Sequence, residues 1–515
     1  MHDNLTPDRR TFLKTLTAGT MAFPLENFIV TTANANPPHR QKQLRRTSPE
    51  AVGIDSGGVV AFLDAVEQKV GGLHSVMLLR HGQVAVEGWW NPYASNHPHQ
   101  LYSLSKSFTS TAVGFAVTEG LLTVETPVAS FFTDQLPGDV PENLASMKIK
   151  HLLTMSTGHD KDALGPTVSA ADGNWVKAFL HLPVEHEPGS KFVYNSAATY
   201  MLSAIVQKLT GMRVVDYLKP RLFDLIGIEG MTWETCPKGI NTGGWGLNVK
   251  TEDIARFGQL YLQKGLWEGK QILSEKWVEE ATTKHVSNGN PADASDWAQG
   301  YGYQFWRCRH GYYRGDGAFG QYCVVLPELD AVLAVTSGVS DMQAVLNAVW
   351  EHLVPAIKPS ILPPSTAHET LRRRISTLAI ASPQGKSTSQ TALRVSGKTY
   401  RFGANPEKFE ALTFGFDGRG GKITLKDAAG EHSFTIGNKS WITGETLLGN
   451  KTPDKVAARG AWTEADTYVA KVCRYETPYI HTFTFKFSGD QVTFTQKRNV
   501  GFGPTDATTL VGKSG

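Results

Sequence analysis

The chain has 515 residues, of which 41% are hydrophobic and 19% are charged, and its formal net charge is +3. This is the composition of a globular protein, and the length predicts two or more domains. The weak positive charge gives no reason to expect a nucleic-acid partner. Past the N-terminus, no apolar run is long enough for stable membrane insertion. The four cysteines lack C-x-x-C spacing, which argues against a zinc site, and Cys308 and Cys323 are either buried free thiols or a pair across neighbouring strands.

The N-terminal segment has the pattern of an export signal. Asp8-Arg-Arg-Thr-Phe-Leu-Lys14 resembles the twin-arginine signal, in which two arginines precede a short apolar stretch, here 15–23. Ala33-Asn34-Ala35 fits a small-x-small cleavage site, although Glu26 interrupts the apolar stretch before it. We therefore expect residues 1–35 to be a signal peptide and the mature protein to be periplasmic or secreted from a bacterium. The alternative is a disordered tail.

The first folded elements are predicted to be a helix and a hairpin. Amphipathic spacing predicts a helix over 56–69 that ends at Gly71-Gly72. Two strand-like runs, 75–80 and 83–89, are separated only by His81-Gly82, the two-residue signal of a tight hairpin. An exposed turn explains His81 better than a role as a catalytic base.

A serine and a lysine at Ser-x-x-Lys spacing follow, in Leu101-Tyr-Ser-Leu-Ser-Lys-Ser-Phe-Thr109. Ser103 and Lys106 are one turn apart at the start of a predicted apolar helix that reaches 119, so an amine can lie beside a hydroxyl. A serine hydroxyl needs a nearby base to become a nucleophile, and burial of Lys106 would lower the pKa of its amine toward that role. The spacing alone is equally compatible with an ordinary amphipathic helix.

A second candidate cluster is Tyr194-Asn195-Ser196, which lies between a Pro-Gly turn at 188–189 and an apolar helix. We expect Tyr194 and Ser196 to lie in the loop before that helix, where their side chains can point into a cleft. A lysine ammonium beside Tyr194 would lower the pKa of the phenol, which could then pass a proton to a leaving group. Otherwise Tyr194 is a core residue beside a helix cap.

The other elements of this region surround the two clusters. A helix predicted over 149–160 carries His151 and His159, to which we assign surface or capping roles. Gly243-Gly-Trp-Gly-Leu-Asn248 is expected to turn against the cleft before a helix over 251–263. Gly317-Ala-Phe-Gly320 would let a strand edge approach a ligand, with a backbone N–H placed to stabilise an oxyanion. Further strands are predicted at 303–308, 312–314, 322–326 and 331–336, and a closing helix at 341–353.

The last third of the chain has a different pattern. Residues 355–392 are rich in proline and polar side chains, which predicts a linker with a short basic helix within 371–381. From 393 onward, apolar and polar residues alternate in runs separated by Gly and Asp turns, at 409–416, 422–425, 467–472, 482–487 and 491–496. This predicts an antiparallel β barrel or sandwich over 393–515. Binding a partner or saccharide, shielding the cleft and a purely structural role all stay open for it.

Taken in order, these motifs resemble the serine β-lactamase and D-Ala-D-Ala peptidase superfamily, on its class C β-lactamase and carboxylesterase-like side. Ser103 and Lys106 form the first motif, and Tyr194-Asn195-Ser196 stands where the class C side has Tyr-x-Asn. The third motif, Lys-Thr-Gly or His-x-Gly, is reduced to Gly315-Asp316-Gly317, followed by Gly320-Gln321. Tyr-x-Ser together with Gly-x-x-Gly-Gln is similar to 6-aminohexanoate-dimer hydrolases and related esterases.

The resemblance covers roughly 47–354 and implies a β-lactamase-like α/β (α+β) domain over 36–354, with an antiparallel sheet flanked by helices. It implies Ser103 as the nucleophile, Lys106 as its activator, and Tyr194 as a second general base that also protonates the leaving group. Ser196 would replace the motif asparagine and position Lys106 or the substrate. The backbone N–H groups of Ser103 and Ala318 would form the oxyanion hole, and no metal or organic cofactor is implied.

The function predicted on this basis is that of an exported serine hydrolase, which cleaves a small-molecule ester or amide through an acyl-enzyme. We expect the substrate to contact Tyr102, Trp245, Gly317 and Gln321. The missing cation of the third motif, which normally helps to hold a substrate carboxylate, speaks against β-lactam turnover. Two alternatives stay open, a β-lactamase or D-Ala-D-Ala carboxypeptidase acting on β-lactams or cell-wall peptides, and a non-catalytic binding protein on the same fold.

Overall fold

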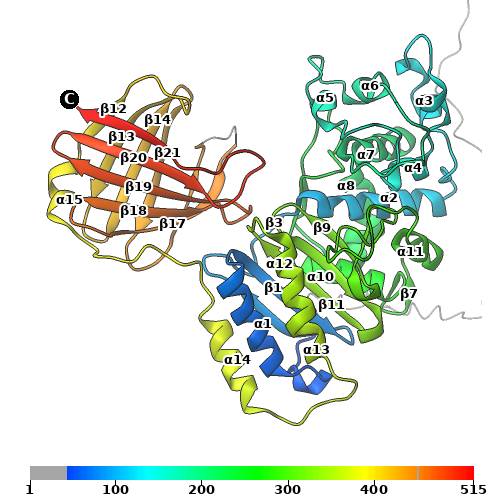
Figure 1. Ribbon diagram of the computed structural model, residues 1–515, viewed down its shortest axis with the longest axis horizontal. Helices are drawn as coiled ribbons and strands as arrows, with labels where there is room; N and C mark the ends of the chain where they lie inside the picture. The colour runs from blue at the N-terminus through cyan, green and yellow to red at the C-terminus, as the bar shows by residue number, and fades with distance from the viewer. Residues whose placement is uncertain (1–42, 449–451) are drawn as a thin grey trace, which may run out of the picture. The chain divides into compact units, whose positions relative to one another are not determined.

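The structure is a computed structural model that describes residues 43–448 and 452–515. An antiparallel sheet with flanking helices is followed along the chain by a closed β barrel (Figure 1), which confirms the predicted fold class and decides for a barrel over a sandwich. The predicted signal peptide, residues 1–35, lies outside the described residues. Among the helices that are described, none combines the length and the apolar character needed to cross a membrane.

A six-stranded antiparallel sheet is the centre of the first region. Its strand order is β2-β1-β11-β10-β9-β8, so a strand from the start of the region pairs with one from its end. The tight hairpin between β1 and β2 turns at His81 and Gly82, which both have positive φ angles, 50° and 69°. The strands are β1 (Leu73–Arg80), β2 (Gln83–Trp89), β8 (Trp306–Arg307), β9 (Tyr313–Gly317), β10 (Gln321–Leu326) and β11 (Ala331–Ser337).

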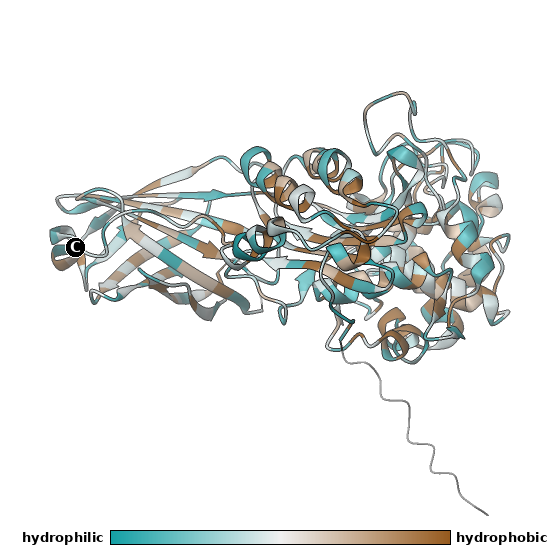
Figure 2. Ribbon diagram, turned by 90° about the horizontal axis from the view of Figure 1, so that it is seen from below, coloured by the Kyte–Doolittle hydropathy of each residue, from teal (hydrophilic) through white to brown (hydrophobic). Residues whose placement is uncertain are grey.

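Helices cover both faces of this sheet, so β1, β10 and β11 are buried along their whole length. One face packs against α10 (Thr251–Leu262), and the other lies under α1 (Ser56–Lys69) and α12 (Met342–Ala348). Side chains along β1 alternate between the two cores, with Met77 on the α10 side and Val76 on the α1 side. In Figure 2 the helices carry both brown and teal segments, as expected when only one side of a helix is buried.

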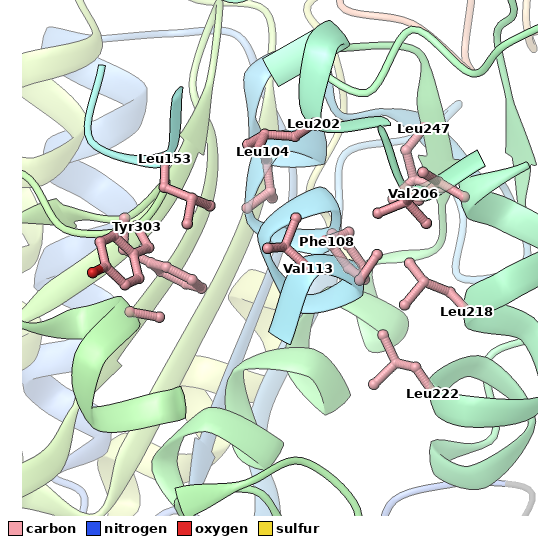
Figure 3. Close-up of a cluster of buried hydrophobic side chains, with 14 of the residues drawn as sticks. Leu104, Phe108, Val113, Leu153, Leu202, Val206, Leu218, Leu222, Leu247 and Tyr303 are labelled. Atoms are coloured by element: carbon pink, nitrogen blue, oxygen red, sulfur yellow. The ribbon is translucent and has the colours of Figure 1, made fainter. Parts of the chain in front are cut away.

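The helical region is built around α2 (Ser105–Thr118), in which residues 105–116 are all buried. It packs against α7 (Ser196–Thr210) and α8 (Val214–Leu218). Figure 3 shows Phe108 and Val113 of α2 within this cluster of aliphatic side chains. Burial of the whole first turn of α2 removes the Lys106 side chain from water.

The remaining elements of this region are short. The predicted helix at 149–160 stops at Leu153, because the chain turns through positive φ angles at Met155 and Gly158. The predicted strand at 303–308 is only the two residues of β8. The short helices are α3 (Glu142–Ser146), α4 (Ile149–Leu153), α5 (Leu164–Val168), α6 (Trp175–Leu180), α9 (Asp224–Ile226), α11 (Glu275–Thr282) and α13 (Val354–Ala356). The short strands are β3 (His99–Gln100), β4 (Thr232–Trp233), β5 (Leu247–Val249), β6 (Leu266–Trp267) and β7 (Lys270–Gln271).

The expected linker at 355–392 is largely built into the first region. Helix α14 (Thr366–Ser376) packs against α1 and β2, and Leu371 is buried there. Leu378 and Ile380 join the same core, and the Ile380 backbone N–H donates to the Asn91 carbonyl over 2.9 Å. Apolar side chains in a proline-rich segment therefore continue the fold as far as residue 380.

The C-terminal region is a ten-stranded barrel preceded by α15 (Gln390–Val395). Its strands pair in the order β15-β14-β13-β12-β21-β20-β19-β18-β17-β16, and a further pairing of β15 with β17 closes the cylinder (Figure 1). Burial alternates along β13 and β19, as the sequence pattern predicts for strands with one face toward a core. The strands are β12 (Thr399–Phe402), β13 (Phe409–Phe416), β14 (Gly420–Asp427), β15 (Gly430–Gly437), β16 (Ile442–Thr446), β17 (Asp454–Trp462), β18 (Thr467–Cys473), β19 (Ile480–Ser488), β20 (Gln491–Arg498) and β21 (Thr508–Ser514).

All four cysteines of the chain, Cys236, Cys308, Cys323 and Cys473, are free and buried. Cys308 belongs to the core on the α1 side of the sheet and Cys323 to the core on the α10 side. The free-thiol alternative therefore holds, because the sheet lies between these two side chains.

Candidate active site

Ser103 lies in a tight turn, Tyr102–Leu104, directly before α2. The preceding residue, Tyr102, has a φ of 47°, a left-handed backbone conformation that is costly for an aromatic residue. The Lys106 amine is 3.0 Å from the Ser103 hydroxyl oxygen. The Ser-x-x-Lys spacing thus produces the contact that it predicts.

The Lys106 amine has three polar neighbours, and their chemistry fixes its orientation. The Gly244 carbonyl, 2.7 Å from Nζ, can only accept a hydrogen bond, and the Ser196 hydroxyl lies at 3.1 Å. A neutral amine has two N–H donors and one lone pair. If both donors are used on Gly244 and Ser196, the lone pair faces the Ser103 hydroxyl, as a general base requires.

The electrostatics of the site favour that neutral amine. Lys106 is 1% exposed, and its burial lowers the pKa to about 7, while the Asp162 and Asp316 carboxylates act in the opposite direction. A free lysine would be almost fully protonated near neutral pH. Here about half of the molecules at pH 7 hold the amine in the form that can accept a proton.

At the start of α7, Asn195 caps the helix and Ser196 contacts Lys106. The Asn195 side chain is the N-cap, since its Oδ1 accepts from the backbone N–H groups of Ala197 and Ala198. Ser196 is the first residue of the helix rather than part of the loop before it, and its side chain faces Lys106. Its backbone N–H donates to Asp162 Oδ1 over 3.1 Å. The asparagine that is displaced from the motif position is therefore occupied in capping the helix.

Tyr194 lines the pocket beside Ser103, and its ring centroid is 5.0 Å from the Lys106 amine. It stacks on Trp306 with ring centroids 5.4 Å apart. Burial raises the pKa of Tyr194, and the Asp316 carboxylate raises it further, whereas the nearby Ser103 hydroxyl opposes these effects. The expected lowering by lysine is therefore wrong, because burial of the phenol raises its pKa instead. Tyr194 is a protonated phenol at rest and can serve as a proton donor.

The end of β9 approaches the Ser103 turn very closely. A Cβ at position 317 would lie 2.0 Å from the Leu101 carbonyl oxygen, so this position requires glycine, and one at position 315 would lie 2.4 Å from the Leu104 side chain, which would have to move. Ala318 follows and lines the same pocket as Ser103, where two backbone N–H groups can serve an oxyanion. Beyond it, Phe319 has a φ of 67°, a second strained aromatic residue beside the site.

Two of the four expected substrate contacts lie elsewhere. Tyr102 and Trp245 line the pocket, but Gly317 packs against the Leu101 backbone and Gln321 is fully buried. The Gln321 amide donates to the Ala318 carbonyl over 3.0 Å and to the Ser337 carbonyl over 2.8 Å. Its side chain thus holds the turn that carries Ala318 and does not reach the substrate space.

The pocket above Ser103 has a volume of about 710 Å³, within the usual range for small-molecule sites. Sequence reasoning missed much of its wall. Trp297, Trp306 and Leu164 provide apolar surface, and the carboxyl groups of Asp162, Glu234 and Asp316 also line it. The described lining residues include no lysine, arginine or histidine.

A buried arginine lies next to the position at which the third motif lacks its cation. Arg314, two residues before Asp316 on the same face of β9, is 0% exposed, and its Nη2 is 2.8 Å from Asp316 Oδ2. Its guanidinium lies over the Trp297 ring, 4.6 Å from the centroid. The i, i+2 spacing of Arg314 and Asp316 is the signal that could have predicted this pair. Because the pair is neutral and Arg314 is covered, it presents no free positive charge to a ligand.

The histidines considered in the sequence lie outside the pocket. His81 is in the β1–β2 turn and pairs with Asp330, and His151 accepts from the Lys148 backbone N–H at the start of α4. His159 is buried beside Thr157. Within the described residues, no group of three or more His, Cys, Asp or Glu side chains could hold a metal ion.

Comparison with known proteins places this site in a family. A family model described as Beta-lactamase matches residues 62–350. The 6-aminohexanoate-dimer hydrolase of Paenarthrobacter ureafaciens is 25% identical over 285 residues, which make up 52% of this chain and 72% of that protein. A protein of Salmonella agona (strain SL483) named "Putative D-alanyl-D-alanine carboxypeptidase" is 23% identical over 253 residues, 44% of this chain and 55% of the relative.

Among solved structures, the octameric penicillin-binding protein homologue from Pyrococcus abyssi aligns with a TM-score of 0.46 and 17% identity, over 89% of this chain and 99% of that one. The family model covers more than half of the present chain and includes Ser103, Lys106, Tyr194 and Ala318. The chain belongs to the β-lactamase family, whose members are serine hydrolases.

Proposed function

We propose that this protein hydrolyses small esters or amides without a substrate carboxylate, through an acyl-enzyme on Ser103. The observation that supports the chemistry is the Lys106 amine, which is 3.0 Å from the Ser103 hydroxyl and has its pKa lowered to about 7. The name of the Paenarthrobacter relative, 6-aminohexanoate-dimer hydrolase, supports hydrolysis as the reaction class, whereas the exclusion of carboxylates rests on the charge of the pocket alone.

In the acylation step of this proposal, the neutral Lys106 amine takes the proton of the Ser103 hydroxyl while the oxygen attacks the substrate carbonyl. The backbone N–H groups of Ser103 and Ala318 stabilise the resulting oxyanion. Tyr194 donates its phenolic proton to the leaving alcohol or amine and regains one from the Lys106 ammonium. The C–O or C–N bond then breaks, and the acyl group stays on Ser103.

Deacylation repeats the sequence with water. Water loses a proton to the neutral Lys106 amine and attacks the acyl carbon, and the Ser103 oxygen leaves with a proton returned from the Lys106 ammonium. Lys106 and Tyr194 therefore end each cycle in the state in which they began it. The Gly244 carbonyl and Ser196 hydroxyl keep the lysine oriented throughout.

The charge of the pocket supports esters and amides over β-lactams. Penicillins, cephalosporins and D-Ala-D-Ala peptides carry a carboxylate, which needs a cationic partner. The described lining offers the three carboxyl groups of Asp162, Glu234 and Asp316 and no positive side chain, since Arg314 is buried against Asp316. A carboxylate would therefore be desolvated here without compensation, at a cost of several kcal/mol.

A substrate panel tests the proposal directly. A short-chain p-nitrophenyl ester should be cleaved with a kcat/KM at least about a hundredfold higher than that of nitrocefin, and Ser103→Ala should abolish the cleavage. Ser110→Ala is the matched control, since this buried hydroxyl on the same helix has no hydrogen-bond partner among the described residues. Rapid nitrocefin turnover with negligible ester cleavage would favour the β-lactamase alternative, and full activity of Ser103→Ala would refute the mechanism.

The activity should depend on pH through Lys106. Because the base must be neutral and its pKa is about 7, kcat/KM should be low at acid pH, rise through neutrality and level off above it. At pH 5 we expect about a hundredfold loss relative to the plateau. Lys106→Arg should be inactive throughout, since arginine stays protonated. A flat profile between pH 5 and 9 would show that Lys106 is not the base.

Tyr194→Phe should discriminate between leaving groups. If the phenol protonates the leaving group, its removal should slow a linear amide or an alkyl ester by about 10² to 10⁴, because their leaving groups are strongly basic. The p-nitrophenyl ester, whose leaving group is stable as an anion, should lose far less. Equal losses for both substrate types, measured as kcat/KM, would contradict the assignment of Tyr194 as the acid.

We also propose that the protein is exported by the twin-arginine route, on the basis of Arg9, Arg10 and the apolar stretch after them. Changing both arginines to lysine should leave a precursor in the bacterial cytoplasm, as measured by fractionation and immunoblotting against the wild-type chain. Unimpaired delivery of this variant to the periplasm would contradict the proposal.

A further inference from the structure

One wall of the Ser103 pocket comes from the C-terminal barrel. Phe502, on the loop between β20 and β21, lines the pocket together with Ser103, Tyr102 and Ala318. It is 76% exposed, an unusual state for a phenylalanine, and Gly501 and Gly503 flank it without covering it. A ring that is mostly uncovered and faces a substrate pocket is available to a ligand.

The base of this loop is fixed against the hydrolase region. Val500 is 2% exposed and packs with Tyr102 and Phe319. The Asn499 side-chain amide donates to the Gly338 and Pro478 carbonyls, each over 2.9 Å, and its Oδ1 accepts from the Ile480 backbone N–H over 2.7 Å. Phe502 is therefore held near the pocket by buried neighbours and directed hydrogen bonds, not only by chain connectivity.

The barrel also contacts both strained aromatic residues of the active site. Phe502 lies edge-on to Tyr102 with ring centroids 5.5 Å apart, and 4.9 Å from the Phe319 ring. The hydroxyl of Tyr479, the residue directly before β19, hydrogen-bonds the Tyr102 hydroxyl over 2.5 Å. Tyr102 precedes Ser103 and Phe319 follows Ala318, so the barrel packs against the neighbours of both proposed oxyanion donors.

We propose that Phe502 is a specificity-determining residue, with which the barrel selects esters or amides that carry an apolar or aromatic group beside the scissile carbonyl. The inference rests on the proposed function and deepens it. The rings of Tyr102, Phe319 and Phe502 form a continuous apolar corner at the pocket, and an aromatic substituent packed there is removed from water and gains edge-to-face contacts.

Three esters, each an ethyl ester or an acetate, test whether Phe502 selects for an aromatic substituent. Ethyl acetate is the small reference, ethyl phenylacetate carries a phenyl group on the acyl side, and benzyl acetate carries one on the alcohol side. Phe502→Ala should lower the ratio of kcat/KM between at least one phenyl-bearing ester and ethyl acetate by about tenfold, measured by pH-stat. Phe502→Leu keeps part of the apolar surface, so its kcat/KM ratio should lie between those of the wild type and Phe502→Ala.

Leu393→Ala is the matched control. Leu393 is 77% exposed, lies on α15 of the same barrel and is not among the pocket-lining residues, so its removal should leave all three ratios unchanged. Unchanged ratios in Phe502→Ala, with wild-type thermal unfolding by circular dichroism, would overturn the inference. Equal losses for all three esters would do the same, because they would indicate a structural role.

Binding measured without turnover separates this inference from the proposed function. In a Ser103→Ala background, Phe502→Ala should raise the Kd of at least one phenyl-bearing ester by about fivefold or more relative to ethyl acetate, as followed by tryptophan fluorescence. This result would support the role of Phe502 even if the wild-type chain cleaved no ester, which would refute the hydrolase proposal alone. Ester cleavage with no Phe502-dependent binding would refute the specificity role alone.

Discussion

The burial of the Lys106 amine is the constraint on which the rest of the site depends. A charged lysine in the first turn of a fully buried helix would be expensive, and the protein avoids that cost by lowering the pKa to about 7. The Gly244 carbonyl and the Ser196 hydroxyl satisfy the amine and leave its lone pair toward Ser103. Burial likewise keeps the neighbouring Tyr194 protonated, and the Asp316 carboxylate adds to this effect. One constraint thus assigns the base and the acid.

The close approach of β9 to the Ser103 turn is the second constraint. A side chain at position 317 would collide with the Leu101 backbone and one at 315 with the Leu104 and Ser107 side chains, so this strand does not carry the lysine or histidine that the sequence resemblance leads us to expect in the third motif. The positive charge of this strand belongs to Arg314, which is buried, pairs with Asp316 and lies over the Trp297 ring. The result is a pocket with aromatic walls and carboxyl groups but no free cation among its described residues. In the proposed function, the packing of these two glycines is therefore linked to substrate preference.

The barrel, which lies outside the residues matched by the family model, also contacts the site. Its β20–β21 loop and Tyr479 pack against Tyr102 and Phe319, the strained residues next to the proposed oxyanion donors. Strained backbone persists only where surrounding contacts hold it, and part of that support here comes from outside the residues matched by the family model. A change in the barrel can therefore alter the site without touching Ser103 or Lys106.

By itself, the sequence determined the fold class, most helices and strands, and the candidate nucleophile with its two candidate partners. These depend on local spacing: one helical turn joins Ser103 to Lys106, and period-two alternation gives β13 or β19. Predictions that rested on local pattern alone were wrong about the length of the helix at 149–160, about a linker over all of 355–392, and about a substrate contact of Gln321. Only the tertiary structure decided the pKa of Tyr194, the Arg314–Asp316 pair and the place of Phe502, some 400 residues from the nucleophile. Desolvation and charge pairing depend on what surrounds a group in space, and that is set by segments far apart in the chain.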